Sequence, residues 1–551
     1  MVARCCAVLG LLFAFVSNAQ AQSFDPSWYR ATPSAKIAVA ADGVYRVTGA
    51  QLQALGFPLG PVSQLELVSN GRQVPFLRLG SGGATLAATD TIVFVGRRNR
   101  GTEEQAWAYL SPEYQSSDYF SLYTDTSYYW LRGGATSSLQ YNALPGAGTL
   151  PTAQASLPDT IHYEVDTYYL AGTTDASMGA GHPMYTQSEG SYITFFTKGG
   201  VFASESPEVL SFNTATPNLD TGTTDSVRMW VKLVGGTGSR HRTSLRFGNE
   251  ANDLGIADWV GYDYRTLYGS VSPTTVANTN NQALVRVRNV YYYDGVSFSN
   301  ASLLNRVYID YVRVAYPRLL RSTSGQDDFW QSTAGAFNLS LSGYTGATRT
   351  LALMPEAGTF ADLPVSSGNA MLAGTLPSAS SVWTSTRAAL KTPTQITLYG
   401  QPALATLAGA DYVIVTTAMF QAQAEALAAY HRTHDGVTTQ VVLQNDILQQ
   451  FDGGRPTPIA LRRFIQATGA WSHPARYVLL LGDALLANRN RFPEPWEVIT
   501  FGNAASDAWL AMSSFSGAGR IERVSLGRIP VRTTERADAF LAKLQAYDTT
   551  P

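Results

Sequence analysis

Asp483 is the residue best placed for chemistry, because it and Gly482 directly follow the apolar run Tyr477–Leu481. A run of this length that stops at turn residues predicts a strand buried on both faces, as in a parallel sheet covered by helices. Asp483 would then lie at the carboxyl end of the strand, where open α/β sheets place ligands and catalytic groups. The alternative, which the local sequence favours, is that its carboxylate only caps or turns the backbone.

A second carboxylate, Asp507, falls in a stretch where loops of the same sheet edge are expected. Two carboxylates in one region can bind a cation or orient a partner group. Two Asp residues are a weak signal, however, and a structural role is the stronger expectation. Arg528, which follows a predicted strand and precedes Pro530, is a candidate ion-pair partner for either Asp483 or Asp507.

Histidine is the other residue type that could move protons or bind a metal. The chain has six: His162, His182, His241, His431, His434 and His473. A metal held by His431 and His434, three apart on a predicted helix, would need a third ligand, and no His-Glu-x-x-His pattern is present. We expect these two to be surface histidines and His473 to be structural or solvated. The sequence also lacks a Gly-x-Ser-x-Gly elbow and a Gly-x-x-x-x-Gly-Lys phosphate loop.

Residues 1–21 have the pattern of a secretory signal peptide, with an apolar stretch from Cys5 to Val16 and a cleavage motif at Ala19-Gln20-Ala21. We therefore expect export to the periplasm, the cell surface or the medium. The two cysteines of the chain, Cys5 and Cys6, both lie inside this segment. The mature chain would then have no disulfide and no cysteine nucleophile.

Bulk composition indicates a globular, β-rich protein of several domains. At ~100–200 residues per domain, the 551 residues suggest three or four domains. The net charge of −2, with only 15% charged residues, gives no indication of nucleic acid or an anionic membrane as a partner. No stretch after the signal is long and apolar enough to span a bilayer.

The elements that must position Asp483 alternate between strands and helices from residue 410 to residue 551. The predicted strands are 411–417, 439–443, 477–481 and 523–526, with a turn at 527–530, and the predicted helical segments are 418–434, 446–451, 457–468 and 534–548. This alternation predicts a parallel sheet with right-handed crossovers. The last helix should bury Ala537, Phe540, Leu541 and Leu544 on one face. It ends close to Pro551, where an alternating unit should continue into another strand, so the domain looks cut short.

The preceding chain reads as all-β. Residues 22–147 form a first β domain in our interpretation, with a hairpin at Asn70-Gly71 and strands that include 73–77, 91–96, 119–123 and 128–131. A connector rich in small residues, 133–158, overlaps its end. Residues 159–317 form a second domain, a β-sandwich of the jelly-roll kind, in which the alternation over 227–233 predicts one buried and one wet face. Residues 319–400 form a small β segment or a linker.

Sandwiches of this kind often bind sugars, and exposed aromatic residues would be the contacts. The candidates are Trp230, Tyr291, Tyr292 and Tyr293. Packing within the sheets is the stronger expectation for them, since aromatic residues are common in strands.

Several motifs of residues 410–551 occur in an order and spacing that are fairly specific together. They are Asp411-Tyr412-Val413-Ile414-Val415-Thr416-Thr417, Thr457-Pro458 with Leu461-Arg462, Pro474 to Asp483, Ser506-Asp507-x-Trp509, Leu526-Gly527-Arg528-Ile529-Pro530-Val531-Arg532, and Lys543-Leu544-x-x-Tyr547. With them, this segment resembles the first half of a gingipain-type cysteine peptidase domain. Segments Gly43–Val47 and Val307–Tyr311 are similar, more loosely, to the N-terminal parts of multidomain members.

The resemblance implies a caspase-like catalytic domain whose His follows a strand as His-Gly and whose Cys ends a neighbouring strand. Neither maps onto any position here, so we assign no catalytic, cofactor-binding or metal residue, and the present half would support the catalytic one. No cofactor is required by the resemblance. It allows structural calcium, but no ligand set is identifiable.

The leading hypothesis is therefore an exported cysteine endopeptidase acting on protein or peptide, represented by a fragment that precedes the dyad and is inactive alone. A processing peptidase of the export machinery, which resembles the same family, is a variant of it. The alternative is a non-catalytic surface or glycan-binding protein in which the sandwich does the work. Cleavage specificity and oligomeric state are not readable from the sequence.

Overall fold

A computed structural model describes most of the chain after residue 27. The described residues are 28–80, 82–102, 104, 119–165, 167–169, 191–198, 209–238, 240–247, 253–261, 263–278, 280, 282–289, 305–485, 492–501, 507–512 and 523–549. The predicted signal peptide with Cys5 and Cys6, His182, and the tyrosines 291–293 lie outside them. None of the helices in the described ranges is long and apolar enough to cross a membrane.

The first β domain packs two sheets against each other, with strand orders β26-β1-β7-β3-β4 and β2-β6-β5. Its elements are β1 (Ser34–Val39), β2 (Gly43–Thr48), α2 (Gly49–Ala54), β3 (Glu66–Ser69), β4 (Arg72–Val74), β5 (Leu77–Leu79), β6 (Thr91–Gly96) and β7 (Ser127–Arg132). The predicted hairpin is confirmed: β3 and β4 pair across Asn70 and Gly71, which both have positive φ.

Two strand predictions in this domain are wrong. The strand predicted at 73–77 is divided between β4 and β5, because Pro75 between them has no backbone N–H to donate. The strand predicted at 119–123 is absent, and Leu122 and Tyr123 instead pack into the hydrophobic core of the α/β domain. Burial of these side chains outweighs the strand preference of an aromatic run.

The edge of the first sheet is completed from far along the chain. Strand β26 (Gln395–Tyr399) pairs antiparallel with β1. A segment placed by the sequence at the end of a linker thus closes the first domain just before the α/β domain begins.

The second β region is a sandwich with one core between two antiparallel sheets. One sheet has the order β12 (Thr194–Lys198), β19 (Asn305–Leu319), β14 (Val227–Gly235) and β17 (Tyr264–Val271), with β9 (Ser156–Tyr163) also on β19; the other has β13 (Val209–Ala215), β18 (Gln282–Asn289), β15 (Arg240–Phe247) and β16 (Gly255–Val260). The predicted alternation on β14 is confirmed, because Val227, Met229 and Val231 are buried and the residues between them are not.

A smaller β unit follows, with a core of its own around Leu339 and Leu372. Its strands are β20 (Gln326–Gln331), β21 (Gly335–Leu341), β22 (Arg349–Met354), β23 (Thr359–Pro364), β24 (Ala370–Leu376) and β25 (Ser380–Thr386). Strand β8 (Asn142–Ala143), from the connector, pairs parallel with β23.

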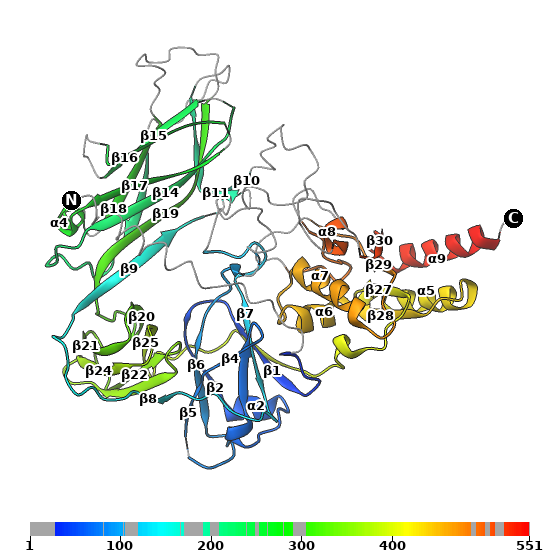
Figure 1. The fold of residues 1–551 in the computed structure, drawn as a ribbon, viewed down its shortest axis with the longest axis horizontal. Helices are drawn as coiled ribbons and strands as arrows, with labels where there is room; N and C mark the ends of the chain where they lie inside the picture. Colours follow the sequence, from blue (N-terminus) through cyan, green and yellow to red (C-terminus); the bar gives the residue numbers. More distant parts are fainter. Residues whose placement is uncertain are drawn as a thin grey trace.

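The α/β domain has a parallel four-stranded sheet of order β28-β27-β29-β30. Its strands are β27 (Tyr412–Thr416), β28 (Thr439–Leu443), β29 (Tyr477–Leu481) and β30 (Ser525–Ile529), and its helices are α5 (Gln421–His434), α6 (Gln444–Phe451), α7 (Pro458–Ala467), α8 (Ala508–Ala511) and α9 (Thr534–Thr549). The predicted fold class, all-β domains followed by a parallel α/β domain, is confirmed (Figure 1).

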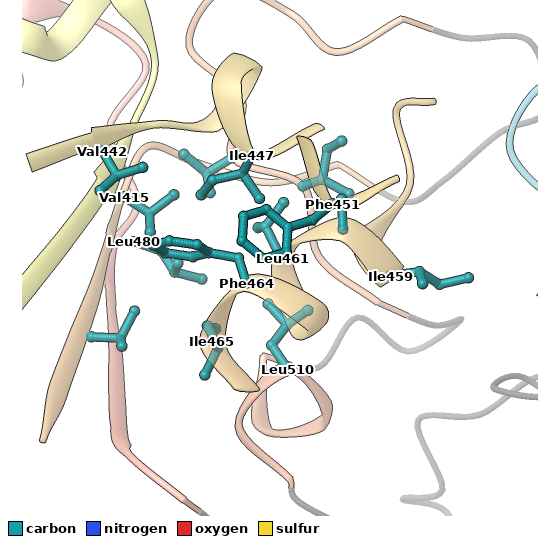
Figure 2. Packing of buried hydrophobic residues seen from close by; sticks show 14 of the residues in the cluster. Val415, Val442, Ile447, Phe451, Ile459, Leu461, Phe464, Ile465, Leu480 and Leu510 are labelled. Atoms are coloured by element: carbon teal, nitrogen blue, oxygen red, sulfur yellow. The ribbon is translucent and has the colours of Figure 1, made fainter. Parts of the chain in front are cut away.

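Strand β29 is buried on both faces, as its apolar run predicts. Val478 and Leu480 join one core, and Leu479 and Leu481 join the other. Figure 2 shows the first of these cores, where Phe464 on α7 points towards Leu480 and Val415. Phe464 is completely buried, so its truncation to Ala should cost roughly 3–5 kcal/mol.

Two predictions at the end of the chain need correction. Strand β30 spans 525–529 rather than 523–526, because all of Ser525–Ile529 pairs with β29 and Pro530 then ends the ladder. An edge strand accommodates Gly527, which suggested a turn. On α9, Ala537 is buried as expected, but Phe540 is 39% exposed and does not share its face.

The first β domain and the α/β domain are joined by specific hydrogen bonds as well as by apolar contact. The indole nitrogens of Trp28 and Trp130 donate to the carbonyls of Gln450 (3.0 Å) and Gly453 (2.9 Å). The first bond holds the last turn of α6 and the second holds the loop that follows it. Figure 1 shows the first domain, in blue, beside α6 and α7. The position of this loop is therefore set by both domains.

Candidate functional site

Asp483 lies at the carboxyl end of β29, as predicted, and its carboxylate is already paired. Its Oδ2 accepts from Nε of Arg532 (2.5 Å), and its Oδ1 accepts from the backbone N–H of Ala484 (2.8 Å). Burial raises the pKa of Asp483, but these donors outweigh it and leave the pKa below its ordinary value. At pH 7 the group is an ionised ion-pair partner.

The glycine before Asp483 has a steric role. Gly482 has a φ of +144°, and a Cβ there would lie 2.6 Å from the carbonyl oxygen of Trp496. This contact would be a clash for any other residue. The turn thus brings the segment after residue 492 across the end of the strand.

Asp507 is paired with Arg528, which settles the choice of partner that the sequence left open. Arg528 donates from Nε and Nη2 to both carboxylate oxygens of Asp507, each at 2.7 Å. Its Nη1 donates to the carbonyls of Gly482 (2.9 Å) and Val498 (2.8 Å). This bidentate geometry makes Arg528 the link between three segments at the sheet edge.

The edge cluster, defined as Asp483, Asp507, Arg528 and Arg532, consists of ion pairs that hold loops together. Each carboxylate is neutralised by a guanidinium, and Asp507 also accepts a hydrogen bond from the hydroxyl of Thr500 (2.8 Å). Within the described part of the chain, no group of three or more His, Asp or Glu residues could hold a metal ion. The structural role favoured by the sequence agrees with this geometry.

Three histidines of the α/β domain lie at the surface in contact with carboxylates. Nδ1 of His431 and of His434 both approach Asp435, at 2.5 and 2.7 Å, and Nε2 of His473 lies 3.0 Å from Asp411. The hydrogen bond from His473, with a second from Thr438, lowers the pKa of Asp411 to about 2. These pairs fit the surface role expected for His431 and His434.

The other two described histidines belong to the sandwich. His241 is buried, with its Nε2 3.0 Å from the carbonyl oxygen of Thr237. His162 contacts Glu164 through Nε2 (2.5 Å) and stacks on Tyr119 of the first domain. The structure brings none of the five described histidines to the edge cluster.

Trp230, the sugar-binding candidate among the described residues, is half-covered on a sheet surface. Its ring lies 5.5 Å from that of Tyr268 on the paired strand β17, and the guanidinium of Arg228 lies 5.9 Å from it. Tyr268 is 48% exposed. The aromatic pair is therefore reachable from solvent on one side.

Sequence reasoning missed a buried charge cluster beside the interdomain loop. Asp452 accepts from Arg455 and Arg463, each at 2.6 Å, and from the hydroxyl of Thr457 at 2.7 Å. Thr457 occupies the predicted N-cap position of α7, but its hydroxyl bonds to Asp452 instead of capping the helix. The Asp-Gly-Gly-Arg-Pro-Thr sequence from Asp452 was the available signal, as a turn motif next to a charge pair.

Sequence reasoning also missed a pocket of about 420 Å³ between the first β domain and the α/β domain. It is lined by residues from both domains, including Lys36, Tyr128, Thr417 and Gln449. A larger hollow of about 920 Å³ lies between the sandwich and the small β unit, lined mainly by Ser, Thr, Gly and Arg residues. The smaller pocket is the one next to the carboxyl ends of the parallel strands.

Comparison with known proteins matches the α/β domain to a peptidase family. Residues 405–551 match the sequence model of peptidase family C25. Among solved structures, the chain is similar to dimeric latent PorU from Porphyromonas gingivalis, with a TM-score of 0.62 and 18% sequence identity. The similarity covers 94% of this chain and 49% of the PorU chain, so this chain spans about half the length of that relative.

Other similarities are remote. A coat protein of Tobacco streak virus matches with a TM-score of 0.14 and 11% identity, over 23% of this chain and 86% of that chain. The isomalto-dextranase of Arthrobacter globiformis T6 matches with a TM-score of 0.16 and 6% identity, over 51% of this chain and 34% of that chain. TM-scores this low do not indicate a shared fold. No curated protein sequence matches the chain. The α/β segment 405–551 is therefore of the gingipain, or C25, peptidase type, as its motifs predicted, within a multidomain fold shared with PorU.

Proposed function

We propose that this chain is part of an exported cysteine endopeptidase of the gingipain type, in which residues 405–551 support the catalytic subdomain. The match of this segment to peptidase family C25 carries the proposal. The edge cluster agrees with it, because both of its carboxylates are paired with arginines and hold loops together. The substrate would be a protein or a peptide.

The catalytic dyad would come from a part of the protein beyond the present sequence. Hydrolysis by this route needs a thiolate and a nearby imidazole. Cys5 and Cys6, the cysteines of the chain, lie in the proposed signal peptide, and no histidine is followed by Gly. The coverage of only 49% of PorU supports the same inference. The 551-residue chain by itself should therefore be inactive.

Activity measurements on two proteins test this proposal. The product of the complete gene should hydrolyse a denatured protein substrate and react with a thiol-directed peptidyl inhibitor, and replacement of the labelled cysteine by Ala should abolish both. The 551-residue chain should do neither. A complete protein with no reactive cysteine and no hydrolysis would contradict the proposal.

Export is the second part of the proposal. The apolar segment and the Ala19-Gln20-Ala21 motif support removal of residues 1–21. Mass spectrometry of the N-terminal peptide of the exported protein should find Gln22 first. A mature protein that begins at Met1 would exclude cleavage.

Glycan binding by the sandwich is a second candidate function, favoured by the half-covered Trp230 beside the exposed Tyr268. Aromatic faces stack on sugar rings, and Arg228 beside them could donate to hydroxyls. A glycan array with the mature chain should detect binding that Trp230→Ala removes, whereas Trp330→Ala, at another exposed tryptophan, should not. An array without signal would leave the aromatic pair as sheet packing.

A further inference from the structure

The pocket of about 420 Å³ lies in a crevice where open α/β folds place ligands. Thr417 follows β27 and Gln444 follows β28, so the pocket covers the carboxyl ends of two neighbouring parallel strands. Its opposite wall comes from β1 and β7 of the first domain, through Lys36 and Tyr128. Its volume falls in the range of about 300–1,000 Å³ typical of ligand pockets.

Lys36 lines the pocket and has more N–H bonds than hydrogen-bond acceptors around it. Nζ of Lys36 lies 3.7 Å above the centre of the Tyr128 ring and donates one long hydrogen bond, of 3.4 Å, to the carbonyl of Gly454. Among the described residues it forms no salt bridge. Burial lowers its pKa to about 7. Whether charged or neutral, the amine keeps at least one N–H free to donate.

An acceptor without a partner lies beside this donor. Gln449 is 8% exposed, and its Oε1 accepts no hydrogen bond from any residue that the structure describes, while its Nε2 donates to Asn445 (3.0 Å). The buried hydroxyl of Thr417, on the same pocket, is likewise unpartnered within the described chain. A buried acceptor without a donor costs about 1–3 kcal/mol, so such groups call for a ligand or water.

Gly454 allows the donor and the acceptor to lie close to each other. A Cβ at Gly454 would lie 2.5 Å from Nζ of Lys36 and 2.8 Å from Oε1 of Gln449. Glycine at this position therefore leaves room for the end of Lys36 and for Oε1 of Gln449, which lie close to each other. The positive φ of Gly454, +99°, also favours glycine there.

Nζ of Lys36 and Oε1 of Gln449 together determine which polar groups of a ligand can bind in the pocket. In an extended peptide the N–H and C=O of one residue point to the same side, so one such residue can offer a carbonyl oxygen to Lys36 and an N–H to Gln449. A carboxylate would satisfy Lys36 but would place an acceptor against Oε1 of Gln449. The remaining lining is mixed, with Gln395, Gln444, Asn445 and Glu494 beside the apolar Met419, Leu448 and Phe492. The apolar side chains fit an apolar side chain of the same peptide.

We propose that the pocket formed by Lys36, Gln449 and the apolar residues Met419, Leu448 and Phe492 binds an extended peptide segment, through the N–H and C=O of one residue and an adjacent apolar side chain. The inference stands on the geometry of the pocket. Only the identification of that peptide as a substrate of the peptidase rests on the proposed function. The first β domain then has a role in recognition, because it contributes Lys36, Tyr128 and Gln395 to the pocket.

Binding of blocked, fluorescein-labelled hexapeptides to the mature chain tests the inference, measured by fluorescence polarisation. A peptide with a central leucine should bind, and one with a central aspartate should bind at least tenfold more weakly. Lys36→Met and Gln449→Leu should each weaken the leucine peptide about tenfold, the effect of one well-placed hydrogen bond. The matched controls Lys391→Met and Gln440→Leu alter similar side chains outside the pocket and should bind like the parent chain.

Photocrosslinking keeps the test decisive if a variant fails to fold. A central benzoylphenylalanine in the same peptide should label the unmodified chain at Tyr128, Met419 or Leu448. Labelling elsewhere, absence of binding at 1 mM peptide, tighter binding of the aspartate peptide, or equal affinity of the folded variants and controls would each overturn the inference. Since the assay needs no catalysis, peptide binding without peptidase activity in the complete protein would count against the proposed function alone.

Discussion

The edge cluster and the interdomain pocket lie at the same carboxyl edge of one parallel sheet. The polar groups of the cluster are hydrogen-bonded to one another, whereas an acceptor of the pocket has no donor among the described residues. In the cluster, Arg528 donates to both oxygens of Asp507 and to two carbonyls. In the pocket, Oε1 of Gln449 accepts nothing from the described residues. Groups that satisfy each other stabilise the fold, whereas a buried group left unsatisfied can still bind water or a ligand. Position at a sheet edge therefore does not by itself identify a binding site.

The largest effect should come from breaking the satisfied cluster. Arg528→Met removes a guanidinium that is 12% exposed and leaves Asp507 without its counter-charge. We expect a loss of about 2–4 kcal/mol in the free energy of unfolding, measured by urea titration. Arg528→Lys should recover little of it, because an ammonium cannot form the bidentate pair. A full recovery by Lys would show that charge alone matters there.

Replacement of Lys36 in the pocket should stabilise the protein, in contrast to Arg528→Met, and the gain should depend on pH. The pKa of Lys36 is lowered by burial from 10.5 to about 7. Between these pH values the unfolded chain holds a proton that the folded chain has lost, so this residue makes stability rise with pH across that window. Lys36→Met should therefore exceed the parent chain in stability by roughly 1–3 kcal/mol at pH 7, and the advantage should shrink towards pH 10. A gap that is constant with pH would exclude titration of Lys36.

Gln449→Leu tests the same difference between the edge cluster and the pocket at an uncharged side chain. It removes an acceptor that is buried without a donor and keeps most of the side-chain volume, although it also loses the bond to Asn445. We expect thermal denaturation to show a change within about 1 kcal/mol, on the stabilising side. A loss of several kcal/mol would mean that Gln449 is structural.

The smallest effect is expected at the exposed side of the cluster. Arg532, which pairs with Asp483, is 52% exposed. Arg532→Met should change the free energy of unfolding by less than about 1 kcal/mol, and 0.5 M NaCl should mask the difference. A larger, salt-independent loss would place this pair with the buried part of the cluster.

Local sequence predicted the elements whose stability is local. The apolar run of β29 and the Thr-Pro start of α7 appear where they were expected, since strand burial and the first turn of a helix depend on neighbouring residues. Predictions failed where distant contacts decide. The aromatic run at 119–123 packs into another domain instead of forming a strand, and β30 extends through Gly527 because β29 offers a partner.

The candidate site divides in the same way. Asp483 at its strand end and the pairing of Arg528 were accessible from the sequence, although the choice of Asp507 as partner was not. The pocket was not accessible, because Lys36 and Gln449 are separated by most of the chain and each is unremarkable in its local sequence. Only the docking of β1 against the loop after α6 brings them together.

Peptide affinity and unfolding free energy, measured side by side on Gln449→Leu and Arg528→Met, test the central contrast most directly. The account predicts that Gln449→Leu loses about tenfold in affinity for the leucine peptide and keeps its stability. It predicts that Arg528→Met loses about 2–4 kcal/mol of stability and, in the fraction that stays folded, binds the peptide normally. The reverse pattern, with binding lost at Arg528 and stability lost at Gln449, would contradict it.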